Sequence, residues 1–257
     1  MSCHSRPGPW QERLRALRPT HVIHLAGGGH SGDDAACRRA NVETTRHLVE
    51  ALRRTGAWLA VASSSAVYGA VPDDALPITE KRPRAAGGPY ATSKAEQEDA
   101  ASRHDGPVCL LRIANAIGPG LPPAFVLGRL AHEVARVGAD PCAVVATGPL
   151  GATRDFVDVR DIAAALVLLC ESVPAGCFNL GSGLETQVRL AAARLWQLSG
   201  ALCRLEEAAA RETAGIPRQV LDCRALAAAT GWAPVHGLDR SLVDMVRWCR
   251  HEGITGR

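Results

Sequence analysis

Three stretches of the chain are almost continuously apolar: residues 21–26, 58–65 and 108–115. Such runs are typical of parallel strands that are covered on both faces, where apolar and polar residues need not alternate. Between them, residues 33–56 and 89–106 carry apolar positions at helical spacing, and each segment ends at a glycine. This alternation of strands and helices predicts an α/β fold with a doubly wound parallel sheet.

The C-terminal half of the chain continues with further helical patterns separated by turns. Helices are predicted over residues 160–172, 186–200 and 238–253, and turns over residues 118–123, 148–151 and 232–237. We find no internal repeat or long linker in the sequence. We therefore expect a core formed by residues 10–117 and 160–182, and a smaller C-terminal substrate-binding lobe formed by residues 118–159 and 183–257.

The composition is that of a soluble globular protein with a sizeable core, since 47% of the 257 residues are hydrophobic. The formal net charge of +3 is spread along the chain without a basic block, which argues against nucleic acid as a partner. No apolar run reaches the roughly 18 residues of a membrane span, and residues 1–10 lack the apolar core of a signal peptide. We therefore expect a cytoplasmic protein without membrane contact.

The nine cysteines are odd in number and form no C-x-x-C pair. Reduced thiols that pack as small apolar residues are the favoured interpretation, with disulfides and metal ligation as the alternatives. We therefore expect no metal site.

Three residue types are unusually rare, which makes their positions informative. The only lysines are Lys81 and Lys94, the only tyrosines are Tyr68 and Tyr90, and the only asparagines are Asn41, Asn115 and Asn179. In a chain rich in alanine and arginine, we expect lysine, tyrosine and asparagine to remain mainly at positions where another residue could not take their role. Chance placement is the alternative.

Tyr90 and Lys94 lie four positions apart on a predicted helix, so their side chains share one face. A phenol is a poor base at neutral pH, but a nearby ammonium group favours the phenolate. Ser64 ends the preceding apolar run, and its hydroxyl could hold a substrate oxygen that exchanges a proton with Tyr90. The alternative interpretation of the spacing is a solvated surface pair.

From about Leu14 to Trp248, the chain resembles the extended short-chain dehydrogenases/reductases, also called the NAD-dependent epimerase/dehydratase family. The resemblance rests on several motifs in order: PTHVIHLAG, ANVETTRHLVEA, SSSAVYG, the Tyr90/Lys94 pair, RIANAIGPG, RDFVDVRDIA, FNLGSG and TGWAP. It implies a Rossmann-like fold and an enzyme.

The resemblance also implies roles for individual residues. Tyr90 is expected to be the catalytic acid/base, Ser64 its partner, and Lys94 the residue that tunes Tyr90 and holds the nicotinamide ribose. Cofactor contacts are expected from Ala26, Gly27, Asn41 and Lys94, and substrate contacts from Gly28, Gly29, Asn115, Arg154, Asn179 and Arg218. Asn115 and Asn179 could instead satisfy backbone groups in turns, and Arg218 could form a surface ion pair. Ser65 and Ala66 replace the acidic pair of sugar 4,6-dehydratases, which argues against that chemistry.

The N-terminal region departs from the family pattern. Only 20 residues precede His21, so we expect roughly two βα units, on the order of 60 residues, to be missing. The usual pyrophosphate-binding loop would be missing with them, and the Gly27-x-Gly29-x-x-Gly32 match is then accidental, although this loop could still hold an anionic group. A truncated Rossmann-like sheet would expose the edge of strand 21–26. We expect a homodimer or another partner to cover it; a rearranged N-terminal segment, a separate polypeptide or a misplaced gene start are alternatives.

Three functional hypotheses follow from these observations. The first is an NAD(P)-dependent epimerase or reductase that acts on a nucleotide-activated sugar or a related polyhydroxylated intermediate. The second is a cofactor-independent isomerase, lyase or cyclase that uses the same site. The third is a non-catalytic binding module or partner subunit, which does not explain why Ser64, Tyr90 and Lys94 are all retained. We expect binding of NAD or NADP to be weakened or absent.

Overall fold

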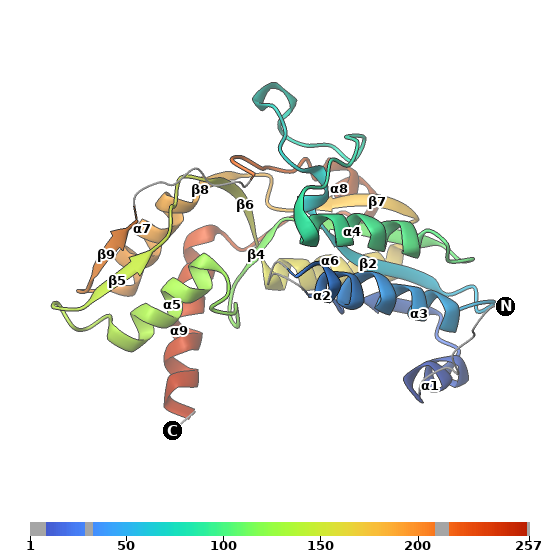
Figure 1. The fold of residues 1–257 in the computed structure, drawn as a ribbon, viewed down its shortest axis with the longest axis horizontal. Helices are drawn as coiled ribbons and strands as arrows, with labels where there is room; N and C mark the ends of the chain where they lie inside the picture. The colour runs from blue at the N-terminus through green and yellow to red at the C-terminus, as the bar shows by residue number, and fades with distance from the viewer. Residues whose placement is uncertain (1–8, 29–32, 209–215, 256–257) are drawn as a thin grey trace. The chain divides into compact units, whose positions relative to one another are not determined.

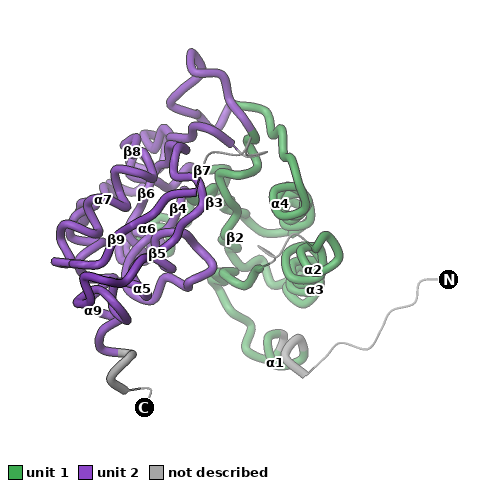
Figure 2. Tube along the Cα trace, turned by 60° about the vertical axis from the view of Figure 1, so that its left-hand side comes forward, with its two compact units in different colours: residues 1–69, 82–113, 168–178 green, residues 70–81, 114–167, 179–257 purple. Residues whose placement is uncertain are grey.

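The computed structural model describes residues 9–28, 33–208 and 216–255 and divides the chain into two compact units (Figure 2). The first unit contains residues 1–69, 82–113 and 168–178, and the second contains residues 70–81, 114–167 and 179–257. Several segments that the sequence analysis places in the core belong to the second unit, namely residues 70–81, 114–117, 160–167 and 179–182. Each unit is described separately below.

The first unit is built on a four-stranded sheet with the order β1-β2-β3-β7 (Figure 1). Its strands are β1 (His21–His24), β2 (Trp58–Ser64), β3 (Val108–Ile113) and β7 (Gly176–Leu180). β1 and β3 both run parallel to β2, with Ile23 opposite Ala60 and Val61 opposite Leu110. The predicted Rossmann-like α/β fold with a parallel sheet is confirmed.

The helices of this unit are α1 (Pro9–Leu17), α2 (Asp34–Arg38), the π-helical turn η1 (Arg39–Glu43), α3 (Thr44–Ala51) and α4 (Gly88–Ala101). Of these, α2, α3 and α4 lie side by side along the sheet, and α1 contacts α3 (Figure 1). The single helix predicted over residues 33–56 is thus interrupted by a π-helical turn. The apolar core between helices and sheet consists of Leu48, Leu52, Ala57, Leu59, Val61 and Ala101.

The second unit has its own apolar core between three helices, α5 (Val126–Val137), α7 (Val188–Ser199) and α9 (Leu238–Thr255). Beside them lie a sheet of order β4-β6-β8 and a parallel pair formed by β5 and β9. Their bounds are β4 Asn115–Ile117, β5 Val144–Thr147, β6 Thr153–Asp158, β8 Glu185–Gln187 and β9 Arg204–Glu207. The remaining elements of the chain are η2 Ser65–Tyr68, η3 Asp73–Ala75, α6 Val159–Ser172 and α8 Arg224–Thr230.

Within the described residues, β1 forms one edge of the four-stranded sheet and pairs with β2 alone. Ile23 and Leu25 are exposed at or just after this strand. The described residues ahead of β1 form α1 and no strand. A partner that covers this edge stays a prediction.

Two general expectations can be compared with the described part of the chain. No helix there has both the length and the apolar character needed to cross a membrane. None of the eight cysteines in these residues forms a disulfide.

A buried ion pair fastens α4 to the sheet. Arg112 on β3 donates from Nε and Nη2 to the two carboxylate oxygens of Glu98, at 3.0 and 2.8 Å. Ser63 Oγ, one residue before the end of β2, donates to the same carboxylate at 2.6 Å. Arg112 also stacks on the Tyr68 ring, 4.7 Å from its centre. Glu98 is 2% exposed, so its charge depends on these partners.

We expect Glu98→Ala to lower the free energy of unfolding by about 3–5 kcal/mol, because it leaves the Arg112 charge buried without its carboxylate. Glu96 on the same helix is a matched control, since it pairs with Arg38 at a partly exposed position. Glu96→Ala should cost less than about 1 kcal/mol. Urea denaturation of both variants measures the difference, and equal losses would contradict the assigned role of the buried pair.

Candidate functional site

Ser64 and Tyr90 meet at the carboxyl end of β2. Ser64 is the last residue of β2, and its hydroxyl caps the turn that follows by accepting a hydrogen bond from the Ala66 amide at 3.2 Å. Tyr90 lies in the first turn of α4, directly after Pro89, a residue suited to a helix start. A hydrogen bond joins the Ser64 hydroxyl and the Tyr90 phenol. The structure therefore brings together the hydroxyl and the phenol that the sequence singles out.

Lys94 follows one helical turn after Tyr90, and its side chain is buried. The residue is 6% exposed, and its ammonium group donates to the Ala62 carbonyl and to Gln97 Oε1, both at 2.9 Å. Burial lowers the pKa of Lys94 to about 8, although the Glu98 carboxylate opposes this shift. The amine therefore loses its charge as the pH rises through about 8.

From the sequence we expect the Lys94 ammonium to favour the Tyr90 phenolate, but burial is the largest influence on the pKa of this phenol. Burial raises the pKa of the Tyr90 phenol above its ordinary value, and the hydrogen bond from Ser64 only partly offsets this effect. Cys37 adds to the rise. Tyr90 is therefore a neutral phenol at neutral pH, which is the form that donates a proton.

Asn41 holds the loop after β1 against α4. Its side chain is fully buried and accepts a hydrogen bond from the Gly28 amide at 3.1 Å. Its amide nitrogen donates to the Gly28 carbonyl and to Ser93 Oγ, both at 2.9 Å. The Gly28 amide, expected to contact substrate, is thus already paired with Asn41, and Asn41, expected at the cofactor, acts on the loop backbone.

The residue at position 27 must be small for this loop to lie where it does. A Cβ atom added to Gly27 would stand 2.7 Å from Asn41 Oδ1 and 3.0 Å from Lys94 Nζ. Both Gly27 and its neighbour Ala26 are exposed. An exposed backbone beside an ammonium group fits the polar ribose of a nicotinamide nucleotide.

The helix after this loop does not fit a pyrophosphate. Asp33 caps the N-terminus of α2 by accepting a hydrogen bond from the Ala35 amide at 3.0 Å, and Asp34 follows it. Two carboxylates occupy the place where a dinucleotide loop offers positive potential to phosphate. This agrees with the interpretation of the glycine spacing as accidental. Gly29, a predicted substrate contact, lies outside the described residues.

The other four predicted substrate residues belong to the second unit. Asn115 on β4 and Arg154 on β6 are half-buried on adjacent strands, with Asn115 opposite Phe156. The Arg154 guanidinium donates to the Thr153 carbonyl at 2.9 Å, and burial lowers its pKa. Both residues are placed on the small sheet β4-β6-β8.

Asn179 and Arg218 have structural partners. Asn179 is fully buried, and its side-chain amide donates to the carbonyls of Ile78 and Asp222, at 2.8 and 3.2 Å. Arg218 forms ion pairs with Glu185 at 2.7 Å and with Asp73 at 3.0 Å. These contacts match the alternative roles that the sequence left open for the two residues.

Sequence reasoning did not single out His24, Thr45 and Gln97, which form a buried polar group behind Lys94. The signal for them is weak, because a single polar residue within an apolar strand or helix is common. No group of three or more metal-binding side chains occurs in the residues that the structure describes.

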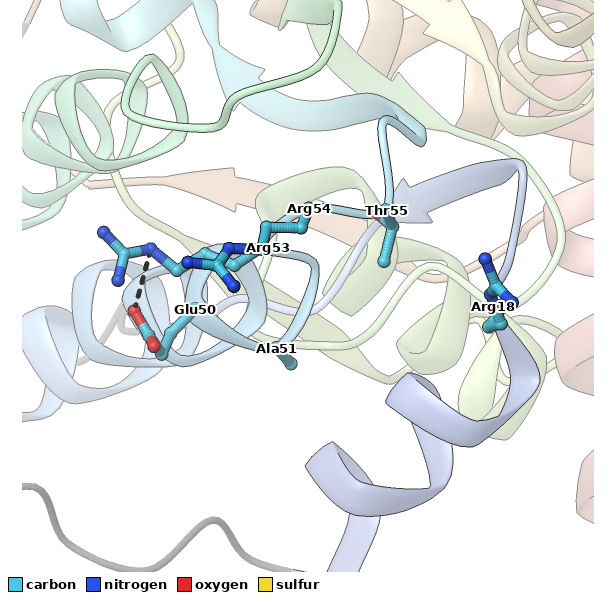
Figure 3. A pocket seen from close by; sticks show the side chains of 6 residues that line it. All are labelled: Arg18, Glu50, Ala51, Arg53, Arg54 and Thr55. Carbon is cyan, nitrogen blue, oxygen red and sulfur yellow. Dashed lines mark ion pairs between the residues drawn. The ribbon is translucent and has the colours of Figure 1, made fainter.

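A separate hollow of about 430 Å³ lies near the amino ends of β1 and β2 (Figure 3). It is lined by Arg18, Glu50, Ala51, Arg53, Arg54 and Thr55. Glu50 pairs with Arg53 at 3.5 Å, and Asp105 accepts a hydrogen bond from the Arg54 amide. Arg53 therefore already pairs with a carboxylate, and none of the predicted site residues lines the hollow.

Comparison with known proteins agrees with the fold. Residues 5–181 match the model of the NAD dependent epimerase/dehydratase family. GDP-6-deoxy-D-mannose reductase of Pseudomonas aeruginosa is 32% identical over 87% of this chain and 78% of that protein. The dTDP-6-deoxy-L-talose 4-dehydrogenase (NAD(P)(+)) of Kitasatospora kifunensis is 30% identical over 88% of this chain and 73% of that protein.

Solved structures agree with these relatives. The structure of RMD from Pseudomonas aeruginosa complexed with NADPH superimposes with a TM-score of 0.85 at 27% identity, over 98% of this chain and 90% of that chain. Together with the order of strands and helices, this shows that the chain belongs to the NAD dependent epimerase/dehydratase family.

Proposed function

We propose that this protein is an NAD(P)-dependent reductase or epimerase that acts on a sugar activated by a nucleoside diphosphate. The observation that carries the proposal is the arrangement of the Tyr90 phenol, hydrogen-bonded to Ser64, with the buried Lys94 amine one turn behind it. Its relatives support the substrate class, since their names refer to GDP- and dTDP-activated deoxysugars.

In the proposed reaction, Ser64 and Tyr90 hold the oxygen of the reacting carbonyl or alcohol. The bound nicotinamide supplies or accepts the hydride. In the reductive direction, the Tyr90 phenol gives its proton to the carbonyl oxygen, and the charged Lys94 amine stabilises the phenolate that remains. In the oxidative direction, the phenolate takes the proton back. Because burial raises the pKa of Tyr90, the phenol is at neutral pH in the protonated form that the reductive step needs.

Arg154 is the proposed ligand for the diphosphate of the substrate. Its planar guanidinium group can donate two parallel hydrogen bonds to phosphate oxygens. Burial lowers its pKa, so an anionic ligand would also offset the cost of burying the charge. Ser65 and Ala66 offer no carboxyl group for water elimination, so dehydration is not proposed.

Tyr90→Phe should reduce turnover of an activated deoxysugar about 10²- to 10⁴-fold, because it removes the transferred proton. The assay follows reduced nicotinamide with GDP- and dTDP-linked sugars and their oxidised forms. Tyr68→Phe, at the only other tyrosine, keeps the ring over Arg112 and should retain turnover within a few-fold. Full activity of Tyr90→Phe would remove the acid/base assignment.

Calorimetric titration with NAD and with NADP separates the redox proposal from cofactor-free chemistry. The nicotinamide end has partners in Tyr90, Lys94 and the loop at Gly27, whereas α2 begins with two carboxylates. We therefore expect detectable but weak binding, in the range between micromolar and millimolar. No heat at millimolar concentration would reject the redox mechanism, and micromolar binding would reject the cofactor-free one.

Gly27→Ala should lower the free energy of unfolding by about 1–3 kcal/mol, because its Cβ would overlap the Asn41 amide and approach the Lys94 amine. Gly28→Ala is the matched control: its Cβ would meet only Ala40 Cβ at 3.8 Å, an ordinary contact. Thermal and urea unfolding of the two variants measures the contrast. A Gly27→Ala protein as stable as Gly28→Ala would show that the loop does not lie against Lys94.

A further inference from the structure

Three buried polar side chains stand behind Lys94 on three different elements. His24 ends β1, Thr45 lies in the first turn of α3, and Gln97 lies in α4, one turn after Lys94. Thr45 and Gln97 are fully buried, and His24 is 6% exposed. Because burying polar groups is costly unless each is paired, their mutual contacts should be specific.

The direction of each hydrogen bond in this group follows from Thr45. Its hydroxyl has a single hydrogen, which is donated to the Asn41 carbonyl at 2.6 Å. Thr45 Oγ1 can therefore only accept from its other two neighbours, His24 Nε2 at 2.8 Å and Gln97 Nε2 at 3.1 Å. The Gln97 amide is fixed with its nitrogen toward Thr45 and its oxygen toward Lys94.

This orientation gives Lys94 a fixed acceptor. Gln97 Oε1 accepts from Lys94 Nζ at 2.9 Å, and the Ala62 carbonyl accepts a second hydrogen at the same distance. Both acceptors carry partial negative charge and favour the protonated amine. Within the described residues, these contacts use two of the three ammonium hydrogens and leave one for a ligand hydroxyl.

The charged and titratable groups around Lys94 have opposite effects on the protonation of its amine. The Glu98 carboxylate on the same helix favours the protonated amine. His24 on β1 would repel it if protonated, but burial and Lys94 together lower the pKa of His24 to about 4. His24 is therefore a neutral donor to Thr45 at neutral pH, and it supports the Gln97 orientation without opposing the Lys94 charge.

We propose that Gln97, oriented by Thr45 and His24, is a positioning residue that holds the Lys94 amine in place and keeps it protonated. The catalytic consequence rests on the proposed function, in which the charged amine stabilises the Tyr90 phenolate. Gln97 contacts the Lys94 amine and the Thr45 hydroxyl, so it acts through Lys94.

The two lysines of the chain make a direct test practicable. Protein grown with lysine labelled with carbon-13 at Cε gives two side-chain NMR signals, from Lys94 and from the exposed Lys81, and Lys81→Arg assigns them. The Lys94 signal should titrate with a midpoint of about 8. The measurement needs neither substrate nor cofactor.

Substitution of Gln97 should move this midpoint in both directions. Gln97→Met removes the acceptor and should lower the midpoint by about one pH unit, and Gln97→Glu adds a negative charge and should raise it by at least as much. Gln187→Glu makes the same charge change at an exposed position of the second unit and should leave the midpoint unchanged. Unmoved midpoints in both Gln97 variants would overturn the proposal.

Variants of Thr45 test whether the orientation of Gln97 matters. Thr45→Val removes the group that fixes the amide, so the Gln97 oxygen is no longer held toward Lys94, and the Lys94 midpoint should fall as in Gln97→Met although no atom in contact with Lys94 is changed. Thr45→Ser keeps the hydroxyl, so its Lys94 midpoint should equal that of the wild-type protein. A Thr45→Val midpoint equal to the wild-type value would show that Gln97 is not oriented by this chain.

The pH dependence of turnover connects the titration to catalysis. We expect kcat to decline as the pH rises through the Lys94 midpoint. This decline should move to lower pH in Gln97→Met and to higher pH in Gln97→Glu, with a smaller change in KM. A shifted midpoint without any turnover would sustain the positioning role and count against the proposed function. If the Lys94 midpoint shifts but the pH dependence of kcat stays as in the wild type, the result would support the proposed function and reject the role of Gln97 in it.

Discussion

The burial of one amine at Lys94 explains most of the architecture of the candidate site. A lysine that is 6% exposed must find hydrogen-bond acceptors in the protein, and it finds them in the Ala62 carbonyl and in Gln97. The amine then fills the space beside the loop after β1, so that position 27 has no room for a side chain. Asn41 fixes the same loop through both polar atoms of its amide. The loop after β1, strand β2 and helix α4 thus all meet at the buried Lys94 amine.

The elements that the sequence predicts well are those in which local pattern and tertiary packing agree. The strands at residues 21–26, 58–65 and 108–115 and the helix that carries Tyr90 all occur, because a buried parallel sheet requires long apolar runs and helices that cover them. The Ser64 and Tyr90 contact follows from the same topology, since strand ends and helix starts meet at one edge.

Other features depend on contacts between distant residues and leave no local signal. The π-helical turn at Arg39–Glu43 is invisible in an otherwise regular helical pattern. Thr45 is 21 residues from His24 and 52 residues from Gln97 in the sequence, so no spacing rule connects these hydrogen-bonded residues. Asn179 is similar, because its partners Ile78 and Asp222 lie far away in sequence. The raised pKa of Tyr90 also follows from burial, which the sequence alone does not reveal.

The π-helical turn also determines how the sequence before and after it can vary. An extra residue in a regular α-helix would rotate everything after it by roughly 100° about the axis, and the wider π turn absorbs most of that rotation. Cys37 before the turn and Leu48 after it are both buried. Loss of a single residue from the turn would therefore leave a regular helix with α2 and α3 in nearly their present phase. A one-residue deletion is thus tolerated better at this turn than within the regular part of either helix.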